Sequence, residues 1–242
     1  MSTTTAIQTP ATPVIEHEAP APRYDLYTGI HKGLRAWMSD VLMLAGRMDP
    51  FDATELDEFA GKLRALLRVC RKHIEHENKY VHGAMERAIP GTSGEVVAEH
   101  VHHEEEIARI ETALTGLERA EWTARPAAAQ GLYRRLALFV AENFVHMNRE
   151  ETAHNAVLWS TYTDLELAEI EQTIVASLSP DEMAEILRRM VPAISAPERA
   201  AMFTGMRLNA PGEVVDQLLA IVKPHLSNRD WIKLCEATGP FP

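Results

Sequence analysis

Residues 56–77, LDEFAGKLRALLRVCRKHIEHE, carry an apolar side chain at every third or fourth position, as one buried face of a helix requires. The recurring residues are Leu56, Phe59, Leu63, Leu66 and Cys70. His73 and Glu77 occupy the next two positions of that face and lie one turn apart. The stretch therefore predicts a long helix whose inward face ends in an imidazole and a carboxylate.

A second stretch, residues 132–157, repeats this pattern with HMNRE at 146–150. Its inward positions are Leu132, Leu136, Phe139, Asn143, His146, Glu150, Ala153 and Val157. Burying an ionisable group without a partner is strongly unfavourable. A metal ion shared between the two His-x3-Glu pairs would satisfy both, so we predict a metal site inside a helical protein.

Histidines also occupy inward positions between and before these two stretches. One predicted face carries Val96, His100, His103, Ile107, Ile110, Leu114 and Leu117, whereas His102 falls on the opposite side. His31 lies at the edge of another apolar face, next to Ile30. Imidazole and carboxylate ligands suit iron, manganese or zinc, and the lack of thiolate ligands argues against an iron–sulfur cluster.

The chain divides by composition into three parts. Residues 1–23 are rich in Thr, Ala and Pro and predict a disordered tail, which includes His17. Residues 24–164 predict four amphipathic helices joined by short turns, hence an all-α, up-down-up-down four-helix bundle. The expected helices span about 25–45, from the Asp52–Glu55 capping box to 88, from the Thr92–Glu95 capping box to 119, and 127–159.

Residues 165–242 predict a smaller, C-terminal helical extension. Three segments begin with capping patterns at Ser179–Glu182, Ser195–Glu198 and Ser227–Asp230. Methionines at helical spacing indicate packing in this part rather than a cofactor site.

Composition excludes several classes of protein. Asp and Glu outnumber Lys and Arg by 35 to 24, which argues against nucleic acid and anionic membranes as partners. Neither a membrane span nor a secretory signal is visible, so we expect a cytoplasmic protein. Two cysteines are too few for a disulfide framework, and Cys70 reads as a small buried hydrophobe.

A second metal-binding pattern competes with the first. Di-iron bundles can use Glu-x-x-His, and the chain contains this spacing at Glu99/His102 and Glu151/His154. Glu99 and His102 fall off the apolar face, and Glu151 lies at its edge, although His154 can point inward. Helical periodicity therefore favours the His-x3-Glu pairs.

The order His31, His73-x3-Glu77, Glu99-His100, His146-x3-Glu150 resembles the hemerythrin-like (HHE cation-binding) family over about residues 24–160. The resemblance implies a four-helix bundle around a non-haem di-iron centre with an oxo or hydroxo bridge. It also implies terminal ligands at the four histidines and bridging carboxylates at Glu77 and Glu150.

One departure from the family concerns the third helix. Oxygen-carrying members have His-x3-His there, whereas Glu104 follows His100 by four residues, leaving His103 as a replacement ligand or an outer hydrogen-bond donor. The set is more similar to relatives that sense iron or oxygen or repair iron–sulfur clusters under stress.

Three functions follow from these patterns. The first is binding or sensing of a small diatomic molecule or peroxide. The second is a di-iron oxidoreductase, or an iron donor, with a redox partner. The third is an interaction module with structural metal or none. Outside the metal set, we expect His76, His82 and His102 in solvent, His154 near the pocket mouth, and Trp37 and Tyr80 in the core.

Overall fold

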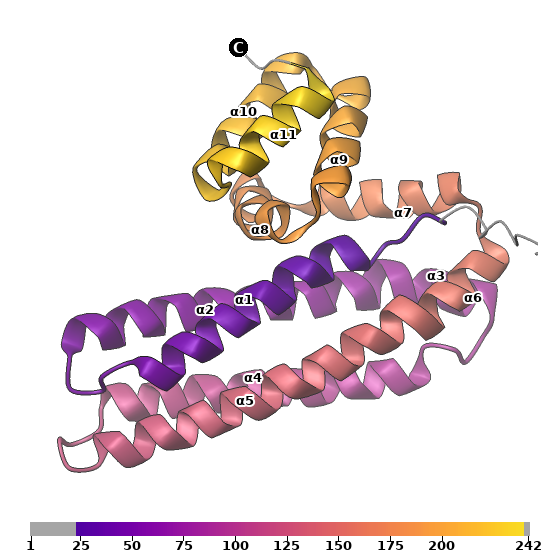
Figure 1. The fold of residues 1–242 in the computed structure, drawn as a ribbon. Coiled ribbons are helices and arrows are strands. Elements are labelled where there is room, and N and C mark those ends of the chain that lie inside the picture. Colours follow the sequence, from indigo (N-terminus) through magenta and orange to yellow (C-terminus); the bar gives the residue numbers. More distant parts are fainter. Residues whose placement is uncertain (1–22, 240–242) are drawn as a thin grey trace, which may run out of the picture.

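A computed structural model describes residues 23–239, and every regular element in that range is helical (Figure 1). The prediction of an all-α protein is therefore confirmed. The disordered tail expected for residues 1–23, including His17, lies outside the described residues except for Arg23. No helix in residues 23–239 is both long enough and apolar enough to cross a membrane.

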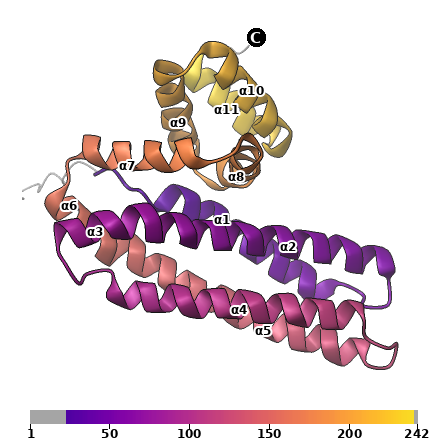
Figure 2. The same cartoon turned by 180° about the vertical axis from the view of Figure 1, so that it is seen from behind.

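The N-terminal part consists of four long helices, two of which contain a π-helical turn and continue beyond it. The elements are α1 (Thr28–Arg47), α2 (Ala53–His76), η1 (Glu77–Val81), α3 (His82–Ala88), α4 (Gly94–Glu118), α5 (Arg125–Arg149), η2 (Glu150–His154) and α6 (Asn155–Thr161). Helices α1, α2, α4 and α5 lie lengthwise beside one another in opposite views (Figures 1 and 2). We call this part the long-helix unit.

The helix starts follow partly from capping chemistry. The Asp52 side chain accepts hydrogen bonds from the N–H groups of Thr54 and Glu55, which is half of the expected capping box. The Glu55 carboxylate accepts from the N–H of Asp49 instead of that of Asp52. The capping box expected at Thr92 is wrong, because Ser93 is the N-cap and its side chain makes no capping bond. The Glu86 carboxylate instead accepts from the backbone of Gly91 and Ser93, so a residue of α3 holds the start of α4.

Two apolar clusters fill the long-helix unit at different levels. The larger contains residues such as Leu63, Leu66, Ile110, Leu114 and Leu136. The smaller contains Tyr27, Val81, Ala84, Met85, Leu158 and Leu167. The sequence-predicted metal residues lie between these clusters along the helices, so apolar side chains close the polar layer from both ends.

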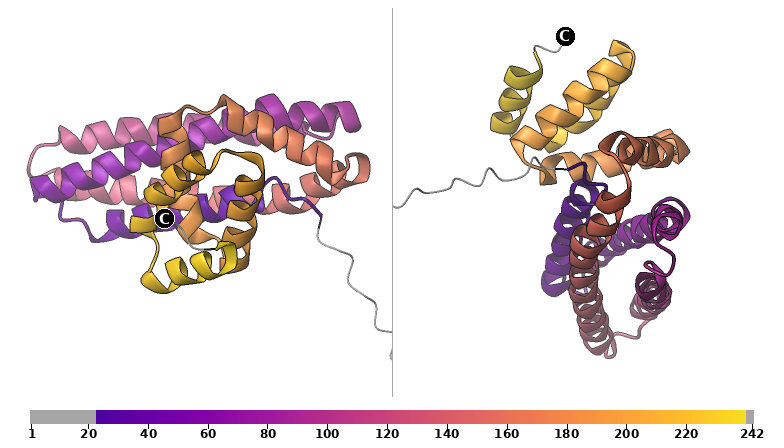
Figure 3. Two further views of the ribbon diagram at one scale, coloured as in Figure 1. Left: turned by 90° about the horizontal axis from the view of Figure 1, so that it is seen from above. Right: turned by 90° about the vertical axis from the view of Figure 1, so that its right-hand side faces the viewer.

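The remaining helices follow the long-helix unit in the chain. They are α7 (Asp164–Ser177), α8 (Pro180–Ala193), α9 (Ala196–Asn209), α10 (Gly212–Val222), the 3-10 turn η3 (Lys223–His225) and α11 (Asn228–Thr238). Helices α8–α11 share a core of their own and stand beside the long helices, as the views from above and from the side show (Figure 3). Buried Leu167 of α7, by contrast, belongs to the smaller cluster of the long-helix unit.

Capping begins two of these helices as the sequence predicts. Ser179 and Ser195 each form a reciprocal capping box, with Glu182 and Glu198 respectively. At α11 the Ser227 side chain accepts the N–H of Asp230.

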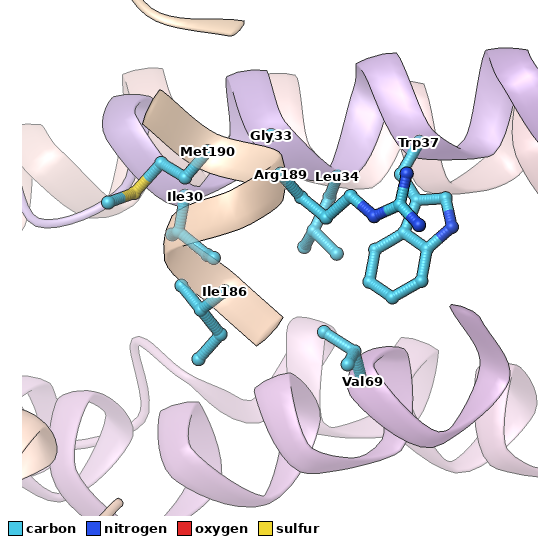
Figure 4. Close-up of a pocket in the computed structure, with 8 residues that line it drawn as sticks. All are labelled: Ile30, Gly33, Leu34, Trp37, Val69, Ile186, Arg189 and Met190. Carbon is cyan, nitrogen blue, oxygen red and sulfur yellow. The ribbon is translucent and has the colours of Figure 1, made fainter. Parts of the chain in front are cut away.

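Helix α8 packs closely on α1 (Figure 4). A Cβ added at Gly33 would come within 2.9 Å of the Met190 Cα, so only glycine permits this approach. The Arg189 guanidinium lies 4.6 Å from the centre of the Trp37 ring, within cation–π range. An ion pair of 2.5 Å joins Lys32 to Glu198, which ties α9 to the same stretch of α1.

Candidate metal centre

Six of the seven sequence-predicted site residues meet inside the long-helix unit. They come from all four long helices: His31 from α1, His73 and Glu77 from α2 and the start of η1, His100 from α4, and His146 and Glu150 from α5 and the start of η2. Five of the six side chains are buried, and the His73 side chain is 15% exposed. His73 is therefore the residue of the six whose side chain is partly exposed.

These side chains form two overlapping groups. His31, His73, Glu77 and Glu150 place ligand atoms within 4.8 Å of one another, and so do Glu77, His100, His146 and Glu150. Both carboxylates belong to both groups. The arrangement has the donors for two ions bridged by two carboxylates, with two imidazoles at each ion.

Imidazole nitrogens within each group point at each other. The Nε2 atoms of His31 and His73 are 3.2 Å apart, and those of His100 and His146 are 3.0 Å apart. Adjacent ligands on one metal with bonds of about 2.1 Å stand about 3 Å apart. The spacing of each histidine pair therefore fits coordination of a single ion.

The opposite ring nitrogens of three histidines have outer partners. Glu151 Oε1 lies 3.1 Å from His31 Nδ1, Asn78 Oδ1 lies 2.8 Å from His100 Nδ1, and Glu99 Oε2 lies 2.8 Å from His146 Nδ1. An acceptor at Nδ1 places the proton there and leaves the Nε2 lone pair free for a metal. The outer partners thus select the tautomer that a ligand needs.

The residue that follows each inward glutamate hydrogen-bonds to a histidine on another helix. Asn78 follows Glu77 and supports His100 of α4, while Glu151 follows Glu150 and supports His31 of α1. Glu151 is itself held by Arg35 at 2.5 Å, and Glu99 is paired with Arg149. Each glutamate that faces inward is therefore followed by a residue that orients a histidine on another helix.

The inward glutamates also begin the two π-helical turns. The N–H of His82 bonds to the carbonyl of Glu77, and the N–H of Asn155 bonds to that of Glu150, five residues back in each case. Such turns widen the helix by one residue and are frequent at functional sites. The extra residue sets back the following side chains by about 100°, and His82 is buried after the turn together with its neighbour Val81.

Burial sets the electrostatics of the glutamates. None of the carboxylate oxygens of Glu77 and Glu150 receives a well-aligned hydrogen bond from residues 23–239. Burial, reinforced by the nearby Glu150 carboxylate, raises the pKa of Glu77 to about 8, and burial also raises the pKa of Glu150 well above its usual range. Their nearest polar neighbours are imidazole nitrogens, such as His73 Nε2 at 3.1 Å from Glu77 and His146 Nε2 at 3.3 Å from Glu150. Burial lowers the pKa of both histidines, so these rings supply no positive charge, and a metal pair would supply it.

The histidines are suited to the same role. Burial lowers the pKa of His100 to about 4 and that of His73 well below its usual range. His31 differs, because its hydrogen bond to Glu151 and its charge contact with Glu77 at 3.6 Å outweigh its burial and raise its pKa. Neutral imidazole is the form that binds a metal, so His73 and His100 would bind without first losing a proton.

His103, the seventh predicted site residue, is buried but enters neither group. Its ring packs edge-on against His146 at 4.8 Å, and its Nδ1 has no hydrogen-bond partner among the described residues. Glu104 is exposed, and so is His102, as expected. The ligand role of His103 stays a prediction.

Several expectations for the surrounding residues are wrong. His82 is 3% exposed rather than solvated, His76 is half-buried, and Tyr80 is partly exposed rather than a core residue. Glu99 and Glu151, which lie off the apolar face or at its edge, hydrogen-bond to His146 and His31 respectively. Their place in the sequence is the available clue: each is next to an inward residue, Glu99 before His100 and Glu151 after Glu150, and such a neighbour can reach the adjacent helix.

Two other expectations are confirmed. Cys70 is buried, and burial raises the pKa of its thiol to about 12. Trp37 is also in the core.

Comparison of the chain with protein-family models, with curated proteins and with solved structures finds no match.

Proposed function

We propose that this protein is a non-haem di-iron protein of the hemerythrin-like kind that binds or senses a small oxidant: oxygen, nitric oxide or peroxide. The observation that carries the proposal is the sharing of Glu77 and Glu150 between two groups of imidazoles. A single-ion site needs no second histidine pair, and a structural zinc site has four ligands in one tetrahedron.

The arrangement of the long helices supports this proposal. In our interpretation α1, α2–α3, α4 and α5–α6 form an up-down-up-down bundle, and each helix contributes at least one ligand in the order that the sequence resemblance implies. Ligands projecting inward from facing helices are the usual way in which bundles hold metal pairs.

The donor set and the proposed redox role together lead us to iron. Four imidazoles and two carboxylates, with no thiolate, suit iron, manganese and zinc alike. Of these, we choose iron because it would supply the redox chemistry for binding an oxidant. The chain itself would hold the ions, fix the histidine tautomers through Asn78, Glu99 and Glu151, and exclude bulk water with the two apolar clusters.

The enclosure of the centre limits what it could bind. Five of the six side chains are buried and His73 is 15% exposed, so a diatomic molecule or peroxide fits such a centre better than a large substrate does. A catalytic oxidoreductase or an iron donor would need a redox partner or acceptor as well.

Iron content and optical spectroscopy test the proposal. We expect two iron atoms per chain after anaerobic loading, with a charge-transfer absorption that changes on exposure to air. The double variant His73→Ala/His146→Ala removes one imidazole from each group and should lose both ions, because each loses half of its nitrogen ligands.

A matched control is His102→Ala/His225→Ala, which removes two exposed imidazoles and should retain two iron atoms. Circular dichroism shows whether both double variants keep their helices. Full iron content in the His73/His146 variant would contradict the site, and iron binding without any response to oxygen, nitric oxide or peroxide would contradict the sensing role.

A further inference from the structure

We propose that His82 and His154, together with Glu150, form a third metal-ion position beside the pair. This inference rests on the proposed function in one respect, because Glu150 also belongs to the pair. The three residues place ligand atoms within 4.8 Å of one another, and each side chain is at most 4% exposed. They come from α3 and from the two ends of η2.

His82 provides the first argument for a ligand. Neither ring nitrogen has a hydrogen-bond partner among residues 23–239, although the side chain is 97% buried. The ring stacks on His100 with centroids 5.0 Å apart and meets His154 edge-on at 5.7 Å. Packing alone leaves two buried polar atoms unsatisfied, which opposes folding, and a cation would satisfy one of them.

His154 provides the second argument, because it is held as the ligands of the pair are held. Its Nδ1 lies 3.3 Å from the Tyr27 hydroxyl, just as the Nδ1 atoms of His31, His100 and His146 lie beside outer partners. When that Nδ1 carries the proton and donates to the Tyr27 oxygen, Nε2 keeps its lone pair for a metal.

The shared carboxylate sets the order of filling. Two imidazoles and one carboxylate are a known ligand set for zinc and suit other first-row divalent ions. A third ion would stand next to two others across Glu150 and would experience their repulsion. It should therefore bind more weakly than the pair and fill last.

Zinc uptake by the metal-free protein tests this position. The full chain is dialysed against rising concentrations of free Zn²⁺, and zinc per chain is measured by elemental analysis. The wild type should reach two zinc ions first and three at higher concentration. The variant His82→Phe/His154→Phe keeps two rings of similar volume but no ring nitrogens, and it should stop at two.

Two further variants separate a lost site from a damaged fold. Tyr27→Phe removes only the outer partner of His154 and should weaken the third ion about 10–100-fold, with the first two unchanged. His102→Phe removes an exposed imidazole and should still allow three ions, which controls for zinc bound at the surface.

The outcomes distinguish this inference from the proposed function. A wild type that stops at two ions, or a His82/His154 variant that still takes up a third, overturns the third position and leaves the pair intact. A wild type that binds fewer than two ions overturns the pair and the third position together.

Discussion

The long helices bury two neighbouring layers on the same continuous faces, one apolar and one ionisable. The apolar layer holds fully enclosed residues such as Leu66 and Leu114. The ionisable layer holds Glu77 and Glu150, whose oxygens have no well-aligned hydrogen bond among the described residues. Each buried leucine stabilises the fold by about 1.5–3 kcal/mol, whereas burial of these two carboxyl groups opposes folding and raises their pKa values. The apolar layer therefore supports the fold, whereas the ionisable layer weakens it in the absence of a bound cation.

The largest expected effect lies in the apolar layer. Leu114→Ala should lower the free energy of unfolding by about 2–5 kcal/mol, with or without metal, because it leaves a cavity among enclosed side chains. Urea denaturation measures this change. Leu138→Ala is the matched control, since Leu138 is 65% exposed and its loss should matter by less than about 0.5 kcal/mol.

The second-largest effect is expected on metal binding, with no loss of stability, when a residue of the ionisable layer is changed. Burial raises the pKa of Glu77 to about 8, so at neutral pH Glu77→Gln replaces a largely protonated carboxyl by a neutral amide of similar shape. The metal-free protein should therefore unfold at an equal or higher urea concentration than the wild type. Bound iron should fall by at least half, because both ion positions use Glu77. Glu142→Gln, on an exposed side chain, should change neither quantity. A metal-free Glu77→Gln protein destabilised by more than about 1 kcal/mol would break the contrast between the layers.

A third test concerns the contact of α8 with the helix that carries His31. Gly33→Ala puts a Cβ within 2.9 Å of the Met190 Cα and should lower stability by about 1–3 kcal/mol. Gly61→Ala, where a Cβ meets no atom within 4 Å, should raise stability by about 0.4–1 kcal/mol. Thermal denaturation compares the two variants. Equal effects of the two substitutions would mean that α8 does not pack tightly on α1.

The smallest effect is expected at Glu86, which holds the start of α4. Hydrogen bonds from Gly91 and Ser93 lower the pKa of Glu86 from 4.5 to about 2. A folded-state pKa below the unfolded value stabilises the protein above about pH 4.5, and this stabilisation is lost as the pH falls towards 2. Glu86→Gln should therefore melt below the wild type at neutral pH, and the difference in melting temperature should vanish near pH 2. A difference that is constant with pH would exclude this role.

Much of the helical architecture and six residues of the candidate centre were predictable, because both depend on one periodicity. An inward face repeats every 3.6 residues. The spacing alone therefore assigns the inward residues between Leu56 and Glu77 to one side of α2 and the start of η1. The same reasoning placed His100 among buried residues and His102 in solvent, where the structure has them.

The outer partners and the π-helical turns were not predictable in this way. Glu99 and Glu151 lie beside the inward face, and only the distance to a neighbouring helix shows that they reach His146 and His31. The sequence of η1, ENKYV, has no property that separates a π-helical turn from an α-helical one. The α-helical period places Val81 and Ala84 on the inward face, where the structure has them, but it gives no sign that the π-helical turn buries His82 as well.

The sharing of Glu77 and Glu150 has a consequence for how the pair would fill. The first ion would draw both carboxylates into position and compensate their desolvation, so the second would meet a site that is already arranged. Where this gain exceeds the repulsion between the ions, uptake is cooperative. At half saturation the population would then consist mainly of empty and doubly loaded molecules, with few chains holding a single ion.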